Sequence, residues 1–223
     1  MRESREAMDG FIQELAERIG HSEKKLMIGI SGHGAAGKTV FAKKLMDQIG
    51  QNKANYLNTD PYIISSSVRI NTMLEYTYED QLHRFKMTAC HPGAHHLPSL
   101  ERDIRMIQDG LSVKTIDTHY LEGELLTADK KLSFIEGMSV AFLNPALFDL
   151  KIYLYTDGQT EFERRAGRDV VERGAELDYL HQSHEERRIQ YELFMHPFRQ
   201  NFDIIIKTVG EQVYFEKNEL RSY

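Results

Sequence analysis

Residues 32–39 read Gly-His-Gly-Ala-Ala-Gly-Lys-Thr and match G-x-x-x-x-G-K-S/T, the pattern of a phosphate-binding loop. In such a loop the glycines let consecutive backbone N–H groups point at phosphate oxygens. The lysine reaches the β and γ phosphates, and the threonine hydroxyl ligates magnesium. The octet therefore predicts a site for a nucleoside triphosphate and Mg²⁺, made by Gly32, His33, Gly34, Ala35, Ala36, Gly37, Lys38 and Thr39.

The segments on both sides of the loop fit this prediction. Residues 26–30 form a short apolar run of the kind that makes a buried parallel strand. Residues 39–49 carry apolar side chains at helical spacing and stop at Gly50. A strand, a glycine-rich loop and a helix in this order would aim the N-terminus of the helix at the phosphates.

Composition limits the class of protein. The chain has 223 residues, 41% of them hydrophobic and 28% charged, which is ordinary for one soluble α/β domain. It has neither a long apolar run nor the apolar core of a signal peptide, so we expect a cytoplasmic protein with no membrane partner. The single cysteine, Cys90, fits a reducing compartment. A net charge of −6 disfavours a nucleic-acid-binding surface.

Strand and helix patterns alternate along the chain, which predicts an α/β fold. Further strands are expected at residues 54–57, 132–135, 150–155 and 203–206, and helices within 1–22, 100–107, 160–167 and 177–194. Together with the first strand they predict a parallel five-stranded sheet with helices on both faces. Residues 63–97 are irregular, with a helix expected over 79–87, and so long an excursion suggests a cover over a substrate.

Two carboxylates stand where predicted strands end. Asp60 follows the strand at 54–57, and Glu136 ends the strand at 132–135 just before Gly137. The carboxyl ends of parallel strands are where α/β sheets place ligands and catalytic groups. From the residues alone, Asp60 is equally a catalytic base or the start of a turn at Pro61, and Glu136 is either a magnesium ligand or a solvated strand end.

Arginine replaces lysine in the C-terminal third. Between Ile152 and Ile206 there is no lysine, but there are seven arginines: Arg164, Arg165, Arg168, Arg173, Arg187, Arg188 and Arg199. The planar guanidinium binds phosphate oxygens in pairs, which favours a phosphate-binding lid. Surface ion pairs with neighbouring glutamates are an equally good interpretation for most of these arginines.

Five blocks together resemble the uridine kinase and phosphoribulokinase superfamily, over about residues 25–207. They are residues 28–39, 58–62, 91–94, 134–137 and 164–174. The resemblance implies a three-layer P-loop NTPase fold and an enzyme that transfers the γ-phosphoryl of ATP to a hydroxyl of a small metabolite, with Mg²⁺ as the metal. Kinases of this superfamily are often homo-oligomers, so the resemblance also implies a homo-oligomer.

The resemblance assigns roles to residues of this chain. It implies Asp60 as the catalytic base, assisted by Lys38, with Thr39 and Glu136 at the metal. The lid arginines Arg168 and Arg173 would serve both catalysis and substrate binding, and Arg164 would be a third phosphate contact. Substrate would also touch Tyr62 and His91, whereas Arg165, Arg187 and Arg188 would form surface ion pairs.

The acceptor half departs from the family pattern. Cys90, Gly93 and His96 stand where uridine kinases carry acids. The acceptor could be uridine or cytidine, another riboside, a vitamin-type metabolite or a sugar phosphate. The spacing of His91, His95 and His96 matches no zinc-ligand pattern, and one or two of these histidines are instead expected to line the acceptor pocket.

We expect one P-loop kinase domain over residues 1–223. Within it lie an N-terminal helix (1–22), a substrate-covering insertion (63–97) and a lid (160–190). The alternative is a nucleotide-binding regulatory protein that has lost phosphoryl transfer, and a third possibility is simple hydrolysis. The Asn-Lys-x-Asp motif that reads guanine is absent from the sequence, which favours ATP.

Overall fold

The computed structural model describes residues 2–173 and 177–220, and the side chains of residues 6–166 and 183–220 among them. The described helices are α1 (Arg2–Gly20), α2 (Lys38–Ile49), α3 (Ser66–Arg69), α4 (Leu97–Gln108), α5 (Gly158–Arg173) and α6 (Leu177–Phe194). The described strands are β1 (Leu26–Ser31), β2 (Ala54–Asn58), β3 (Met73–Tyr78), β4 (Gln81–Lys86), β5 (Val113–Lys114), β6 (Leu125–Leu126), β7 (Leu132–Glu136), β8 (Leu150–Thr156), β9 (Ile204–Val209) and β10 (Gln212–Asn218).

The central sheet has the strand order β10-β9-β8-β1-β7-β2. All five predicted strands are present and run parallel, as the alternating pattern predicted. The predicted number of strands was wrong, because β10 adds a sixth strand, antiparallel to β9. Gly210, with a φ of 57°, turns the chain back between these two strands.

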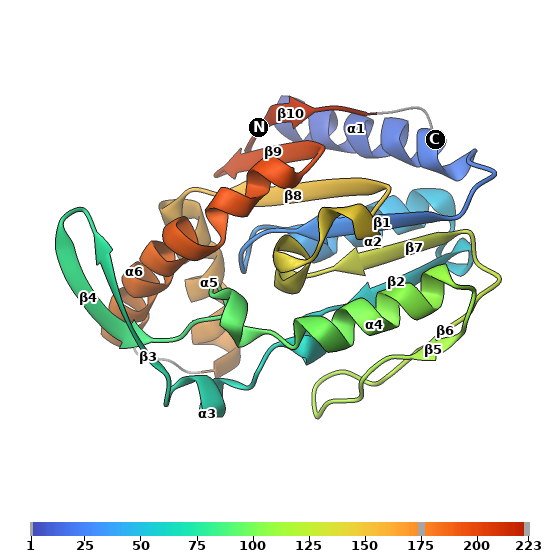
Figure 1. Ribbon diagram of the computed structural model, residues 1–223. Coiled ribbons are helices and arrows are strands. Elements are labelled where there is room, and N and C mark those ends of the chain that lie inside the picture. Colours follow the sequence, from blue (N-terminus) through green and yellow to red (C-terminus); the bar gives the residue numbers. More distant parts are fainter. Residues whose placement is uncertain (1, 174–176, 221–223) are drawn as a thin grey trace.

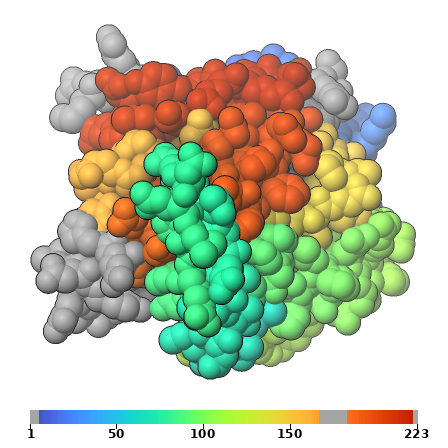
Figure 2. All heavy atoms as spheres, turned by 60° about the vertical axis from the view of Figure 1, so that its left-hand side comes forward, coloured from blue at the N-terminus to red at the C-terminus, as the bar shows by residue number. Residues whose placement is uncertain are grey.

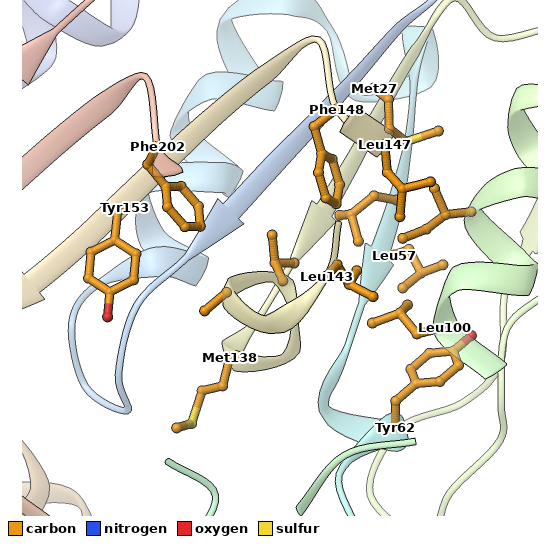
Figure 3. Close-up of a cluster of buried hydrophobic side chains, with 14 of the residues drawn as sticks. Met27, Leu57, Tyr62, Leu100, Met138, Leu143, Leu147, Phe148, Tyr153 and Phe202 are labelled. Carbon is orange, nitrogen blue, oxygen red and sulfur yellow. The ribbon is translucent and has the colours of Figure 1, made fainter. Parts of the chain in front are cut away.

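Helices cover both faces of the sheet (Figure 1), each over its own buried apolar cluster. On one face α1 and α2 pack on inward-facing side chains such as Ile28 and Phe134. On the other, α4, the end of α6 and the segment 138–148 pack around Leu57 and Tyr153 (Figure 3). This sandwich holds the carboxyl ends of β1, β2, β7 and β8 in fixed register at one edge.

The segment 63–97 contains a hairpin, so the helix predicted over 79–87 was wrong. Strands β3 and β4 pair antiparallel around Glu79 and Asp80, whose φ values of 48° and 61° are those that a type I′ hairpin turn requires. The hairpin lies across α6 on the surface (Figure 2), held by hydrogen bonds from Tyr76 to Glu186 (2.9 Å) and from Gln190 to Tyr76 (3.0 Å).

Within the described ranges, no helix combines the length and the apolarity that crossing a membrane requires.

Candidate active site

The phosphate-binding loop, residues 32–39, joins the end of β1 to the start of α2. Two of its glycines carry φ values that other residues rarely adopt, 143° at Gly32 and 92° at Gly37. A Cβ on Gly32 would lie 1.8 Å from the carbonyl oxygen of Leu154, so β8 packs directly against the loop. Gly37 places no side-chain cap on α2, which leaves the first N–H groups of that helix available to an anion.

Lys38 crosses the loop. Its side chain is buried, with the residue 9% exposed, and Nζ donates a hydrogen bond of 3.0 Å to the carbonyl oxygen of His33. The ammonium group therefore already lies against the backbone that would cradle phosphates. A triphosphate would offer this cation stronger partners than a neutral carbonyl oxygen.

Three oxygen-bearing side chains meet beside the loop. The Thr39 hydroxyl donates to Oε2 of Glu136 at 3.0 Å, and the Tyr56 hydroxyl donates to the same oxygen at 2.7 Å. Glu136 is only 3% exposed. The structure thus brings together the two residues predicted to hold the metal, and it adds Tyr56, which the sequence did not indicate.

Asp60 lies next to this cluster, at the carboxyl end of β2. Its backbone N–H donates to Oδ1 of Asn58 at 2.9 Å, which starts the short 3-10 turn Asp60–Tyr62 and leaves the residue exposed. The pKa of Tyr56 is raised by burial, by Glu136 and also by the negative charge of Asp60. The geometry agrees, since Asn58 lies opposite Glu136 in the sheet and the Thr59 N–H donates to the carbonyl oxygen of Glu136, so Asp60 follows directly after the backbone that is bonded to Glu136.

Gly137 keeps β2 and β7 close together at this edge. Its φ is 146°, and a Cβ there would lie 2.0 Å from Oγ1 of Thr59. The Thr59 N–H donates to the carbonyl oxygen of Glu136 at 2.8 Å. The residues before Asp60 and after Glu136 are therefore in direct contact, which holds together the two backbone segments that carry the carboxylates.

The arginines divide into three groups. Arg164 donates to the carbonyl oxygen of Ala35 at 3.3 Å, so it does lie at the loop. Arg165 and Arg188 form ion pairs with glutamates, as predicted, but their side chains are only 12% and 20% exposed, so the predicted surface location was wrong. The side chains of Arg168 and Arg173 lie outside the described residues, although both positions belong to α5.

His33 occupies the second position of the loop but does not face a phosphate. Its ring is fully buried, and Nε2 accepts a hydrogen bond of 2.9 Å from the N–H of Thr156. Only its backbone can take part in the phosphate cradle, because the side chain points into the protein.

Tyr62 does not line the site either. The residue is 1% exposed and packs in the apolar cluster of Figure 3, where its hydroxyl donates to Oδ2 of Asp103 at 2.5 Å. The sequence predicted a substrate contact because Tyr62 follows Asp60 closely. The 3-10 turn instead rotates its ring into the core, where it supports the turn that carries Asp60.

We expect Tyr62→Phe to lower the free energy of unfolding by about 1–3 kcal/mol, because it leaves Oδ2 of buried Asp103 without its donor, while Oδ1 keeps the hydrogen bonds from Arg102. Urea unfolding measures this loss. The KM for the acceptor should stay within about twofold of the wild-type value, since no substrate can reach the ring. A large rise in that KM with unchanged stability would instead restore Tyr62 as a substrate contact.

The histidines differ in their surroundings. His91 accepts a hydrogen bond of 3.0 Å from the N–H of Gly93, and burial lowers the pKa of His91. His95 is buried, with Nδ1 2.8 Å from the Ser139 hydroxyl and Nε2 2.9 Å from the carbonyl oxygen of Ala89. His96 is exposed at the start of α4. His95 is therefore a structural residue, whereas His91 and His96 are the two of these three histidines that retain exposed surface.

The burial of His95 predicts that the free energy of unfolding falls in acid. Burial lowers the pKa of His95 to about 4, so the folded protein holds it neutral. The stability that comes from keeping His95 neutral is fully present above the unfolded pKa of about 6.5 and is lost as the pH falls toward 4. Between pH 7 and pH 4.5 we expect the wild-type protein to lose about 2 kcal/mol more than His95→Gln, measured by urea unfolding. Exposed His119→Gln is the control and should keep the wild-type pH dependence, because His119 is not among the charged groups that act on His95; an equal loss in His95→Gln would contradict the assignment.

Two hollows on the described surface lie outside this cluster. One, of about 340 Å³, lies between the β3–β4 hairpin and α6, and includes His83 and Arg188. The other, of about 600 Å³, lies between α4 and residues 142–144. Neither hollow is lined by Lys38 or Asp60. The candidate active site is therefore defined by the loop and the strand ends, and these two hollows are separate from it.

The model of the phosphoribulokinase / uridine kinase family matches residues 27–214. The uridine kinase of Lactobacillus helveticus is 28% identical over 207 residues, which cover 86% of this chain and 91% of that protein. The chloroplastic phosphoribulokinase of Arabidopsis thaliana is 24% identical over 209 residues, 89% of this chain but 53% of the relative, so the chain spans about half the length of that enzyme. The solved phosphoribulokinase from Rhodobacter spheroides shares the fold, with a TM-score of 0.62 at 20% identity over 84% of this chain and 71% of that one.

Proposed function

Because the chain belongs to the phosphoribulokinase and uridine kinase family and is an ATP-dependent small-molecule kinase, we propose that its acceptor hydroxyl binds beside Asp60. The observation that carries this proposal is the contact of Thr39 and Tyr56 with Glu136, together with the pairing of β2 and β7 that puts Asp60 directly after the backbone bonded to Glu136. The relatives described above give no support to a regulatory protein without transfer activity.

Each group has a task in this proposal. The loop N–H groups and Lys38 hold the β and γ phosphates, and Arg164 lies at the loop as a further cation. The acceptor oxygen attacks the γ-phosphorus as the bond to ADP breaks, and Asp60 takes the hydroxyl proton. Arg168 and Arg173, which follow on α5, are proposed to reach the transferred phosphoryl.

The donor atoms at the strand ends suit Mg²⁺. A hydroxyl and a carboxylate are the hard oxygen ligands that this ion takes alongside phosphate oxygens. We propose that Thr39 and Glu136 hold it, with Tyr56 fixing one carboxylate oxygen. Bound Mg²⁺ would neutralise charge on the phosphates.

In the stretch 90–96, few of the side chains are exposed enough to touch an acceptor. Cys90 is buried and His95 is tied to Ser139 and Ala89, so this stretch presents His91 and His96 instead of carboxylates. We propose a hydroxyl-bearing metabolite of the riboside or vitamin type, with uridine and cytidine among the candidates. The β3–β4 hairpin would cover the acceptor side and α5–α6 would act as the lid of a single kinase domain; a cytoplasmic location and a homo-oligomer stay predictions.

A panel of acceptors tests the proposal. The protein is incubated with ATP labelled in the γ-phosphoryl and with single nucleosides, pantothenate-like vitamins or sugar phosphates. We expect label on one class of acceptor only. ADP formed at the same rate with and without every acceptor would instead indicate a hydrolase.

A further inference from the structure

A carboxylate is buried between the phosphate-binding loop and the lid helices. Glu161, in the first turn of α5, is 2% exposed. Its Oε1 accepts from Nε of Arg165 at 2.8 Å and its Oε2 from Nη1 of Arg188 at 3.2 Å, and Nδ1 of His33 lies 3.4 Å from Oε2. A loop residue and both lid helices therefore meet at one acidic group.

The bonds of His33 define its tautomer. Nε2 accepts from the N–H of Thr156, so the proton is assigned to Nδ1, which lies 2.7 Å from the carbonyl oxygen of Gly34. The same Nδ1 faces Glu161. The imidazole thus links the loop to the end of β8 and to the start of α5.

Glu161 stays ionised in this position. Burial alone would raise the pKa of Glu161, but the hydrogen bond from His33 and the charges of Arg165 and Arg188 hold it well below its ordinary value. Arg188 is shared with a second carboxylate, Glu192, at 2.6 Å. Arg188 is thus held between two carboxylates, whereas Arg165 pairs with Glu161 and also reaches Gly34 of the loop.

Arg165 lies directly over the loop. A Cβ built on Gly34 would be 2.3 Å from Nη2 of Arg165, so the guanidinium fills the space that a side chain at this position would take. Nε points to Glu161 and the Nη end points to the loop. A guanidinium held in this way presents its donors at the place where phosphate oxygens would lie.

We propose that Glu161 is a positioning residue for triphosphate binding, because its carboxylate holds Arg165 over Gly34. His33, a residue of the loop, contacts the same carboxylate and so keeps it next to the loop. The inference rests on the proposed function only in that residues 32–39 hold the triphosphate. It assigns no contact between Glu161 and the ligand, since its carboxylate is covered by Arg165 and Arg188. It does assign Glu161 an effect on ATP affinity that is exerted through Arg165.

The test is a double-variant cycle on ATP binding, measured by calorimetry in Mg²⁺ without any acceptor. We expect Arg165→Gln to weaken ATP binding about tenfold and Glu161→Gln about fivefold, with the double variant within about twofold of Arg165→Gln. The matched control is Glu163→Gln, an exposed carboxylate on the same helix that bonds Gln159 at 2.7 Å; it should keep the wild-type affinity.

Two results would overturn the inference. One is an unchanged ATP affinity in Glu161→Gln, even if its melting temperature falls, because Glu161 would then only support the fold. The other is a double variant whose loss is the product of the two single losses, because Glu161 would then act independently of Arg165. Should Glu161→Gln fail to fold, Glu161→Asp takes its place in the cycle. Since no acceptor is present, failure to find an acceptor would leave these measurements unaffected.

Discussion

Lys38→Ala is expected to lower kcat/KM for ATP by about 10³-fold or more. Lys38 is the cation that crosses the loop, with Nζ bonded to the carbonyl oxygen of His33. Truncation removes a positive charge from a buried place where negative charge spreads over the transferred phosphoryl. The steady-state rate of ADP release measures the loss.

A second lysine of the same helix provides the control. Lys44 lies on α2, is 49% exposed and pairs with Asp9 at 2.7 Å, far from the loop end of the helix. Lys44→Ala should leave kcat/KM within about twofold of the wild-type value. Equal activity in Lys38→Ala and the wild-type protein would refute the placement of the phosphates on residues 32–39.

Asp60→Asn is expected to lower kcat by about 10²–10⁴-fold while ATP affinity stays within about twofold of wild type. The amide keeps the shape of the carboxylate but cannot take the hydroxyl proton. The Asp60 backbone N–H bonds Asn58, so the 3-10 turn that presents the side chain is preserved. Rates at saturating ATP and acceptor, together with calorimetry, separate the chemical step from binding.

Asp47→Asn is the matched control for that substitution. Asp47 is an exposed carboxylate on α2 that accepts a hydrogen bond of 2.6 Å from Gln51, away from the strand ends. It should keep the wild-type kcat. If Asp60→Asn also kept it, Asp60 would be only the first residue of a turn, the other interpretation that its place before Pro61 allows.

The parallel core of the fold could be predicted because its strands are buried on both faces. Residues such as Ile28 and Ile152 therefore form near-continuous apolar runs between helical patterns. The edge strand β10 was not predicted because it mixes exposed polar and aromatic side chains and lacks a continuous apolar run. The turn at Gly210 and the alternation of Val213 and Phe215 were the available signals. The β3–β4 hairpin was not predicted because its turn residues, Glu79 and Asp80, include neither the glycine nor the asparagine that usually marks a type I′ turn.

Part of the candidate site could likewise be predicted from the sequence, and part could not. The sequence placed Thr39 and Glu136 together because each belongs to a motif tied to a strand or helix end. Nothing in the sequence links Tyr56 to Glu136 or Arg165 to Gly34, because these contacts join elements far apart in the chain. Tyr62 shows the opposite error: two residues after Asp60, the 3-10 turn carries its ring into the core.

The most direct measurement is the ratio of phosphorylated acceptor to ADP, followed by ³¹P NMR for the acceptor identified in the panel. The structure predicts one phosphorylated hydroxyl for each ADP with the wild-type protein, and neither product with Lys38→Ala. ADP that accumulates without phosphorylated acceptor, or transfer that survives in Lys38→Ala, would contradict an ATP-dependent kinase acting at residues 32–39.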